Sequence, residues 1–508
     1  MKPCLLDPQG QFDANAALPA EAEALTQDLA LAPLFATMAA GDAQVDAVAR
    51  RALFAAPAND AAVVAWRHAV LADWRAQPER LAQLRQLADT ALAAEKRAFR
   101  TVFSRIPESR LTRGLLALRI LRSSLLELRE TLLPLQATAR SAGLQGLCAI
   151  VLERLDEDFF TALDLHLEAL SFPGGLLLRA GLDEDCRASA PQLCPPPAKL
   201  PGWRLRLRGL LRREPASYRF HIAPRDEAGN RALSELRTRG IAHAAALIEA
   251  LVDQFVGFLA ALSAELALYQ GLLRLEARLQ LLGAPLCQPA LSESALACSA
   301  EGLYDVSLAL HAGRPVVGND LAADGQCLLI ITGANQGGKS TFLRSLGQAR
   351  LMAQAGFPVA ARAACFARLS GVFTHFRREE DRQMRSGKLD EELARLSALL
   401  PSLRRGSLLL MNDSFAATNE REGSEIAAEV VRALVEQGVM VVFVTHLYAF
   451  ACAVQAEAAQ TGRQDVQFLR AQRSDDGQRS FRLEVGEPLP TAWGQDLYTR
   501  IFGEGAPA

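Results

Sequence analysis

The chain has 508 residues, half of them hydrophobic, with a formal net charge of −2 and a pI near 6.4. This length predicts two or three domains with substantial cores. The charge excludes a globally basic nucleic-acid-binding protein but leaves room for a local basic surface.

No stretch approaches the run of about 18 apolar residues that a membrane span needs, and the N-terminus lacks a signal-peptide pattern. Nine cysteines are scattered without a C-x-x-C pair, and the seven histidines show no metal-ligand spacing. Such cysteine usage is typical of reduced thiols. We therefore expect a cytoplasmic protein with no membrane association.

Residues 1–170 are predicted to form a helical core, because Ala, Leu, Arg and Glu dominate and apolar residues recur every three or four positions. A leucine-rich stretch from Arg110 to Ala139 carries Pro134, a candidate kink. We interpret its arginines as a solvated face, with nucleic-acid phosphates as the alternative partner. The predicted helices span residues 19–40, 60–76, 78–104, 109–139 and 143–170.

Residues 171–225 are predicted to be a small β-containing insertion, because proline- and glycine-rich turns interrupt the helical pattern. Arg204, Arg206 and Arg208 alternate with apolar residues over 203–210, which indicates a strand with one basic face. Residues 217–226 predict a second strand that ends in a turn. We interpret the basic face as a solvated edge strand, with nucleic-acid binding as the alternative.

Residues 226–300 are predicted to contain a long lever or connector helix. The helical pattern runs for about 50 residues without proline, a length on the order of 75 Å at 1.5 Å per residue. Gly240, Gly257 and Gly271 are the candidate bend positions. A helix this long exceeds what a compact core accommodates.

From residue 301 to 508 strands alternate with helices, which predicts an α/β domain with a parallel sheet. The apolar run 328–331 precedes a G-x-x-x-x-G-K-S motif at 333–340, and a helical pattern follows. Strand, glycine-rich loop and helix form the context of a phosphate-binding loop. Its N–H groups and the helix dipole would hold a polyphosphate, with Lys339 on the β- and γ-phosphates and Ser340 on Mg²⁺.

Two later strands end in polar residues, at the edge where ligands of parallel sheets bind. SLLLMND, residues 407–413, resembles the ATPase strand whose acids hold Mg²⁺ and polarise water. His446 ends the strand pattern 439–446, where it would sense the γ-phosphate, although a structural histidine is the alternative. Further predictions are a helix at 422–438, a hairpin at 466–488 turning near Asp476 and Gly477, and a short helix at 492–502.

The motifs of residues 300–505 together resemble the ATPase domain of the MutS family, a group of ABC-type ATPases that act on DNA in mismatch repair and recombination. The resemblance rests on GANQGGKSTFLR, the turn at Gly356, LLLMND and THLYAF, in that order. It extends more weakly to FAAPANDAAVVAWRHAVLADW in the helical part. It implies a multidomain fold, with an α-helical core and lever followed by an α/β ABC-type P-loop ATPase domain.

The resemblance also implies the residues of an ATP site. Lys339, Asp413 and His446 would be catalytic, and Ser340, Asn412 and Asp413 would hold Mg²⁺. The nucleotide loop would comprise Gly333, Ala334, Asn335, Gln336, Gly337, Gly338, Lys339, Ser340 and Thr341.

A second set of residues matches the family's signature segment, which reaches across a dimer to the partner's ATP. These residues are Ser386, Gly387 and Glu392. Residues 319–321 match a stretch before the phosphate-loop strand, and Thr418 matches the loop after SLLLMND. The resemblance therefore implies a homodimer formed through the ATPase domain.

The chain departs from the family pattern at Asn412-Asp413, where typical members have Asp-Glu. Neutral Asn412 would hold Mg²⁺ less strongly, and Asp413 is one methylene shorter than Glu. SFAAT replaces the glycine-rich segment that follows. Slow hydrolysis, or ATP acting as a conformational switch, is therefore expected. We find no mismatch-recognition domain or Phe-x-Glu motif near the start and no helix-turn-helix after 505, so mismatch reading is not expected.

The sequence thus predicts a MutS-like ATPase that binds DNA, with ATP closing two ATPase domains and moving the helical levers. The alternative is a hydrolytically weak ATP-dependent clamp or scaffold acting with a protein partner. A third hypothesis is an ABC-type ATPase that has a protein partner and no role on DNA.

Overall fold

The computed structural model divides into two compact units. The first contains residues 1–3, 82–139 and 144–263, and the second contains 4–81, 140–143 and 264–508. The four-part division expected from sequence follows changes in pattern and stays a prediction. The residues that the structure describes are 1–56, 60–99, 106–173, 175–182, 184, 188–194, 221–223, 225–334, 336–377, 387–473 and 479–489.

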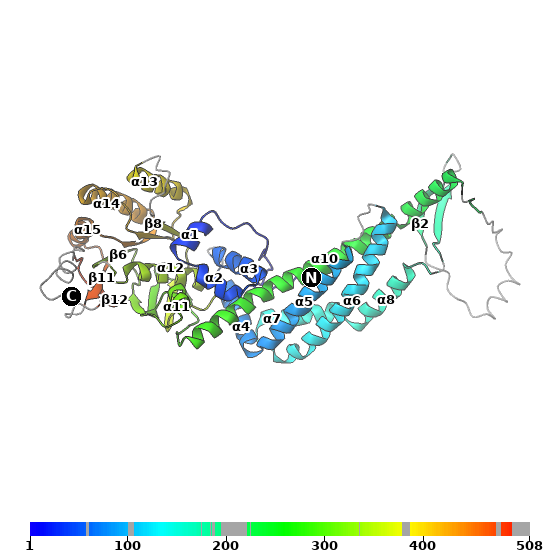
Figure 1. Ribbon diagram of the computed structural model, residues 1–508, viewed down its shortest axis with the longest axis horizontal. Coiled ribbons are helices and arrows are strands. Elements are labelled where there is room, and N and C mark those ends of the chain that lie inside the picture. The colour runs from blue at the N-terminus through cyan, green and yellow to red at the C-terminus, as the bar shows by residue number, and fades with distance from the viewer. Residues whose placement is uncertain are drawn as a thin grey trace, which may run out of the picture. The chain divides into compact units, whose positions relative to one another are not determined.

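The first unit is built mainly from helices (Figure 1). In α6 the leucine stripe is buried, and the helix continues through Pro134 to Thr138. A spacing of three and four residues places those leucines on one face, which explains why this stretch forms a core helix. The helices are α5 (Pro78–Phe99), α6 (Pro107–Thr138), α7 (Ala142–Arg154), α8 (Glu157–Ala169) and the N-terminal part of α10 (Glu227–Leu281).

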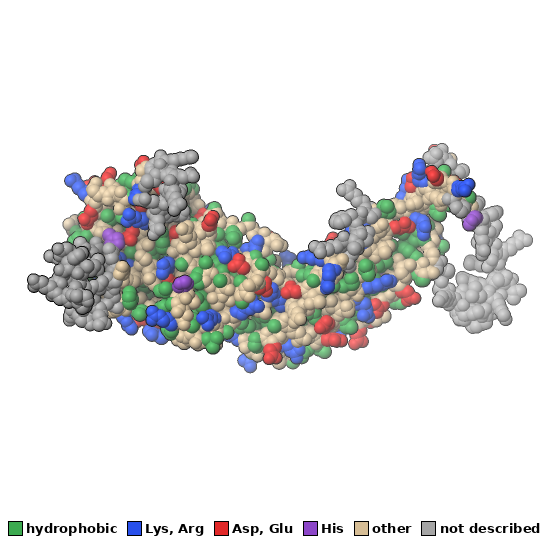
Figure 2. All heavy atoms as spheres, in the orientation of Figure 1, with side chains coloured by type: hydrophobic (Ala, Val, Ile, Leu, Met, Phe, Trp, Pro, Cys, Tyr) green, Lys and Arg blue, Asp and Glu red, His purple; other side chains and the backbone are tan. Residues whose placement is uncertain are grey.

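Arginines of α6 bind carboxylates on neighbouring helices of this unit. Arg110 and Arg113 both contact Glu249 of α10, and Arg122 Nε lies 2.6 Å from Asp164 Oδ1 of α8. The hydrogen bond from Arg110 holds the pKa of Glu249 below its usual value. On the face seen in Figure 2, basic and acidic side chains are interspersed along these helices. These three arginines therefore join helices within the chain.

Helix α10 is the predicted long helix, and its 55 residues form one uninterrupted element. It continues through all three glycines that were candidate bends. Two of these glycines instead let a neighbouring side chain pack closely on α10. A Cβ at Gly240 would lie 2.4 Å from Leu178 Cδ2, and a Cβ at Gly271 would lie 2.8 Å from Val45 Cγ1. Within the described residues, α10 is long and apolar enough to cross a membrane. The core helix of a soluble protein meets the same criteria.

The 171–225 region contains an antiparallel hairpin of β1 (Leu178–Leu182) and β2 (Ala188–Leu193). The predicted strand at 203–210, with its alternating arginines, lies outside the described residues. Half of the predicted strand at 217–226 also lies outside them, and its described residues, 221–223, 225 and 226, do not form a strand.

Two predicted helices are each divided in the structure. The expected helix 19–40 is α1 (Ala22–Asp28) and α2 (Ala32–Ala39), separated by Ala30 at φ 51°. The left-handed backbone at Ala30 ends one helix, and a proline in the first turn of α2 favours a new start. The expected helix 143–170 is likewise divided into α7 and α8. Asp156 has an extended backbone between them and caps the N-terminus of α8, so a new helix begins there.

The second unit is organised around a six-stranded sheet in the order β12-β11-β6-β10-β9-β8. Five neighbouring strands of this sheet are parallel, namely β8, β9, β10, β6 and β11. The edge strand β12 pairs antiparallel with β11. The middle strands are continuous apolar runs because helices cover both faces. The strands are β6 (Leu328–Thr332), β8 (Gly371–Phe376), β9 (Ser407–Asn412), β10 (Met440–Val444), β11 (Val466–Arg473) and β12 (Arg479–Val485).

A smaller four-stranded sheet has the order β3-β7-β4-β5. Its strands are β3 (Ala290–Ser292), β4 (Cys298–Leu303), β5 (Asn319–Ala322) and β7 (Ala363–Ala367). The alternation of strands and helices predicted for 301–508 is confirmed in the described part of this region. The predicted turn at Asp476-Gly477, the helix 492–502 and Asn335 lie outside it.

The helices of the second unit come from both ends of the chain. Residues 4–81 contribute α1 to α4, so this N-terminal segment belongs with the sheets. The helices and one 3₁₀ turn not yet given are α3 (Ala43–Phe54), α4 (Ala61–Ala76), α11 (Val306–Ala312), α12 (Lys339–Ala355), α13 (Lys388–Leu399), η2 (Leu400–Ser402), α14 (Glu420–Glu436) and α15 (Tyr448–Thr461).

A buried carboxyl group of α10 holds the N-terminal segment. Glu265 Oε2 accepts hydrogen bonds from the N–H groups of Leu5 at 2.5 Å and Leu6 at 3.3 Å. The Tyr269 hydroxyl donates to the carbonyl oxygen of Leu5 at 2.7 Å. Burial raises the pKa of Glu265 from 4.5 to about 7, although the two N–H donors oppose the rise. This segment is therefore attached through a group that titrates near neutral pH.

We predict that Glu265→Gln removes a pH-dependent part of the stability. The folded chain binds the Glu265 proton more tightly than the unfolded chain, so this contribution is present below pH 4.5 and is lost as pH rises through 7. The shift corresponds to about 3 kcal/mol. Urea unfolding between pH 5 and 8 should show the wild-type free energy of unfolding falling by this amount relative to the variant. Parallel curves for the two proteins would contradict the prediction.

Candidate functional site

The glycine-rich loop connects β6 to α12 at the carboxyl edge of the six-stranded sheet. Gly333 has φ 109° and Gly338 has φ 90°, both in the region that favours glycine. The β11–β12 hairpin packs closely on the loop, because a Cβ at Gly337 would lie 2.6 Å from Ala471 Cβ. Backbone conformation and close packing thus explain the glycines in this motif.

Lys339, the first residue of α12, folds back over the loop. Its Nζ donates hydrogen bonds to the carbonyl oxygens of Gly333 at 2.6 Å and Ala334 at 3.0 Å. The side chain is buried, and burial lowers the pKa of the ammonium group while Asp413 opposes this shift. The loop therefore encloses one cation whose partners are backbone dipoles, which anionic ligand oxygens can replace.

Ser340 and Asn412 meet where α12 begins and β9 ends. Ser340 Oγ donates to Asn412 Oδ1 at 2.9 Å. Two neighbouring ligands of an octahedral Mg²⁺ are also separated by about 2.9 Å, for metal–oxygen bonds of about 2.05 Å. Both atoms are oxygens of the type that Mg²⁺ prefers, so these residues fit the ion that the sequence implies.

Asp413 and His446 lie at the tips of the adjacent strands β9 and β10. Asp413 has φ 53°, and its N–H donates to the carbonyl oxygen of Val444 at 2.9 Å. Its Oδ1 lies 3.3 Å from His446 Nε2 and is buried without a hydrogen-bond partner. The pair is close enough for an ion pair but lacks hydrogen-bond geometry. The left-handed backbone of Asp413 thus places an acceptor oxygen beside Lys339 and His446.

Glu392 of α13 contacts the residues that follow Asp413 in its own chain. Its Oε2 accepts a hydrogen bond from Phe415 N–H at 2.9 Å, and burial raises the pKa of the carboxyl group. The buried His375 ring of β8 lies 2.7 Å from Ser414 Oγ and 3.1 Å from the carbonyl oxygen of Glu392. Helix α13 is therefore attached to the loop at Ser414 and Phe415.

Sequence reasoning missed His375 and Ser414. The available signals were a histidine near the end of the apolar strand 371–376 and a serine directly after Asp413. Gly387 is the N-cap of α13, and Ser386 lies outside the described residues. Thr418 donates a hydrogen bond to Glu422 in the first turn of α14.

The predicted stretch 319–321 supports the hairpin that covers the loop. Asn319 Oδ1 accepts from Leu483 N–H at 2.7 Å, and its Nδ2 donates to the carbonyl oxygen of Phe481 at 3.3 Å. A cavity of about 310 Å³ begins here and reaches the loop at Gly338 and Thr341. Tyr304, Val316, Asn319, Phe342 and Phe481 are among the residues that line it.

The fold and site define an α/β domain with a glycine-rich loop, a lysine and serine at the following helix, and polar residues at neighbouring strand tips. Two family models match the chain in succession. The model described as MutS2 N-terminal domain matches residues 59–282, and that described as MutS domain V matches 329–488. The chain belongs to the MutS family.

Individual relatives match over shorter stretches. The chain is 30% identical to MutS protein homolog 4 of Mus musculus over 146 residues, which is 29% of this chain and 15% of that protein. It is 34% identical to Endonuclease MutS2 of Thermus thermophilus over 146 residues, or 28% and 20% of the two chains. For DNA mismatch repair protein MutS of Chloroflexus aurantiacus, identity is 30% over 189 residues, or 34% and 19%. The chain thus spans a fifth or less of the length of these curated relatives.

We predict that Glu392→Ala destabilises the chain by about 1–3 kcal/mol, because the buried N–H of Phe415 loses its acceptor. Urea unfolding measures the effect. Glu391→Ala is the matched control, since the side chain of Glu391 is exposed on the same helix turn. Equal losses in both variants would show that the Glu392–Phe415 hydrogen bond does not carry the effect.

Proposed function

We propose that this chain is a DNA-associated ATPase of the MutS type that binds ATP and Mg²⁺ at residues 333–341 of an ABC-type P-loop domain. The observation that carries the proposal is the 2.9 Å contact between Ser340 Oγ and Asn412 Oδ1. It places two Mg²⁺-compatible oxygens beside a loop that already holds a buried lysine. The MutS domain V match covers the same residues.

The proposed reaction is phosphoryl transfer from ATP to water. The loop N–H groups bind the phosphates, and Lys339 exchanges the carbonyl oxygens of Gly333 and Ala334 for phosphate oxygens. Bound Mg²⁺, held by Ser340 and Asn412 with Asp413 nearby, would neutralise charge that develops on the phosphates. Asp413 Oδ1 orients the attacking water and accepts its proton. His446 positions Asp413 and contacts the γ-phosphate.

The adenine-bearing part of ATP would occupy the cavity that continues from Gly338 and Thr341. Its volume of about 310 Å³ lies in the range of small-ligand sites. Aromatic rings of Tyr304, Phe342 and Phe481 line it, and such rings suit a planar base.

The proposals that the chain binds DNA and forms a dimer are supported by its membership of the MutS family. The relatives include a protein named for DNA mismatch repair and one named as an endonuclease, which supports DNA as the partner here. We propose a homodimer through the ATPase domain. In this dimer Ser386 and Gly387 would lie near the partner's ATP. Glu392 would hold the loop at Ser414 and Phe415 of its own chain. The eight cysteines in the described ranges are free thiols. We propose that the protein is cytoplasmic and acts without a membrane.

A hydrolytically weak clamp or scaffold is the second candidate function. Asn412 carries no charge to hold Mg²⁺, and Asp413 reaches less far than a glutamate. ATP would then close the dimer around DNA or a protein partner without efficient turnover. Rapid hydrolysis by the wild-type chain would exclude this alternative.

We predict that Lys339→Ala lowers ATP turnover by about 100-fold or more, because it removes the cation that stabilises the phosphates. Steady-state hydrolysis is measured with and without duplex and branched DNA. Lys96→Ala, which removes an exposed lysine of α5, is the control and should keep wild-type turnover. DNA-stimulated turnover supports the ATPase. ATP binding without turnover in the wild type supports the clamp.

We predict that Asn412→Asp lowers the Mg²⁺ concentration for half-maximal activity or ATP binding by about an order of magnitude, because ligand charge tunes the affinity of oxygen sites. A Mg²⁺ titration of ATP binding and hydrolysis measures this. Asn230→Asp adds the same charge at an exposed position of α10 and controls for net charge. An unchanged Mg²⁺ midpoint in Asn412→Asp would place the metal away from this residue.

A further inference from the structure

Arg67 of α4 holds the far end of the helix that starts at the glycine-rich loop. Its Nη1 donates to the carbonyl oxygen of Ala355, the last residue of α12, at 2.7 Å. Gly356 follows with φ 76°, and a Cβ there would lie 3.0 Å from Arg67 Cβ. A glycine at the end of α12 therefore allows the arginine to approach the helix terminus closely.

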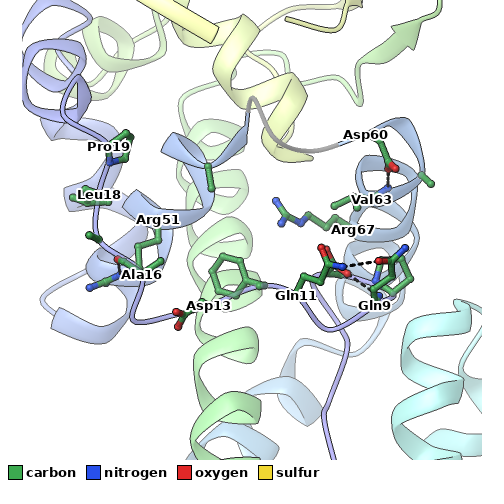
Figure 3. Close-up of a pocket in the computed structure, with 16 residues that line it drawn as sticks. Gln9, Gln11, Asp13, Ala16, Leu18, Pro19, Arg51, Asp60, Val63 and Arg67 are labelled. Atoms are coloured by element: carbon green, nitrogen blue, oxygen red, sulfur yellow. Dashed lines mark hydrogen bonds between the residues drawn. The ribbon is translucent and has the colours of Figure 1, made fainter. Parts of the chain in front are cut away.

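Arg67 is buried, with 3% of the residue exposed, and its guanidinium forms no ion pair within the described residues. The guanidinium lies at the negative end of the α12 dipole, where carbonyl groups lack partners within the helix. The carboxylates of Asp7 and Glu265 also attract it. Burial lowers the pKa of Arg67, which is the cost of this arrangement. Figure 3 shows the side chain projecting from α4 into a cavity of about 370 Å³ lined by the N-terminal segment.

The same guanidinium also binds the segment comprising residues 4–7, here called the N-terminal strap. Arg67 Nε donates to the carbonyl oxygen of Leu6 at 2.8 Å, while the N–H of Leu6 donates to Glu265 of α10. Leu5 is bound to α10 on both of its backbone groups, through Glu265 and Tyr269. Leu6 is thus bonded to Arg67 on one side and to α10 on the other.

A second connection between α4 and α10 bypasses the strap. Arg75 of α4 and Glu276 of α10 form an ion pair at 2.6 Å, with a second hydrogen bond from Arg75 Nε to Glu276 Oε2 at 2.9 Å. Within the described residues, the side-chain hydrogen bonds of Arg75 go to Glu276 and do not reach α12 or residues 4–7. It therefore offers a matched comparison for Arg67 on the same helix.

We propose that Arg67 and the N-terminal strap transmit the nucleotide state of loop 333–341 from α12 to α10, with Arg67 acting as a positioning residue. The inference rests on the proposed ATP binding. A rigid helix that begins at Lys339 and Ser340 carries any shift of the loop to its end at Ala355, where Arg67 is bound. Coupling of this kind is reciprocal, so the strap also influences ATP affinity.

The test is hydrogen–deuterium exchange of the full chain, with and without ATP and Mg²⁺, measured at residues 4–7 and 264–271. In the wild type, ATP should change the exchange rates of the Leu5 and Leu6 amides by about fivefold or more, the lower end of typical coupling between sites. Arg67→Met should still bind ATP but lose this response. Arg75→Met should keep it.

A separate ATP-binding titration distinguishes the two proposals. If the wild type does not bind ATP, the proposed function and the coupling fail together. If ATP binds and the strap amides do not respond, or respond equally in Arg67→Met, only the coupling is overturned. Should Arg67→Met fail to fold, Arg67→Lys retains the charge but cannot present two nitrogens in the same fixed geometry. This variant should still bind ATP but show a weakened strap response, and a full response would overturn the coupling.

Discussion

Burial of α12 is the constraint on which the rest of the second unit depends. Residues 345–355 of this helix are all buried, including the polar Gln348, Arg350 and Gln354. Each of these three finds partners in the surrounding chain: Gln348 binds Asp305 and Val306, Arg350 binds Ala297, and Gln354 binds Leu369. A Cβ at Gly347 would lie 2.6 Å from both Leu29 and Leu410. Such a helix fits its surroundings in one orientation, because buried polar groups need partners and no space is left.

That single orientation places the site. The N-terminus of α12 presents Lys339 and Ser340 at the sheet edge, where β9 and β10 deliver Asn412, Asp413 and His446. The neighbouring strands are in parallel register, with Val444 opposite both Ile331 and Asn412, so the three strand tips end at one level. Lys339 and Ser340 can therefore meet the strand-tip residues although about 70 to 110 positions of sequence lie between them. Neutral Asn412 contributes an oxygen without a charge, so it would bind Mg²⁺ less strongly than a carboxylate.

Much of this arrangement was predictable from local pattern. The patterns at 328–331, 407–413 and 439–446 indicated strands, and they correspond to β6, β9 and β10 of the parallel sheet. The glycine-rich motif indicated a strand–loop–helix junction, which the structure contains. The division of 19–40 into two helices was missed, because Ala30 carries no sequence signal for its left-handed backbone. The roles proposed for the site residues stay predictions, since contacts alone do not show a reaction.

The sequence by itself determined the element types, the glycine-rich loop and the polar strand tips, because these depend on residues close together in the chain. Only the tertiary structure decided that His375 and Ser414 join α13 to the loop after β9, and that Arg67 binds both Leu6 and Ala355. Those contacts join segments up to 288 residues apart. Burying these polar groups would cost free energy without hydrogen-bond partners, and the packing of the whole unit sets which partners are available.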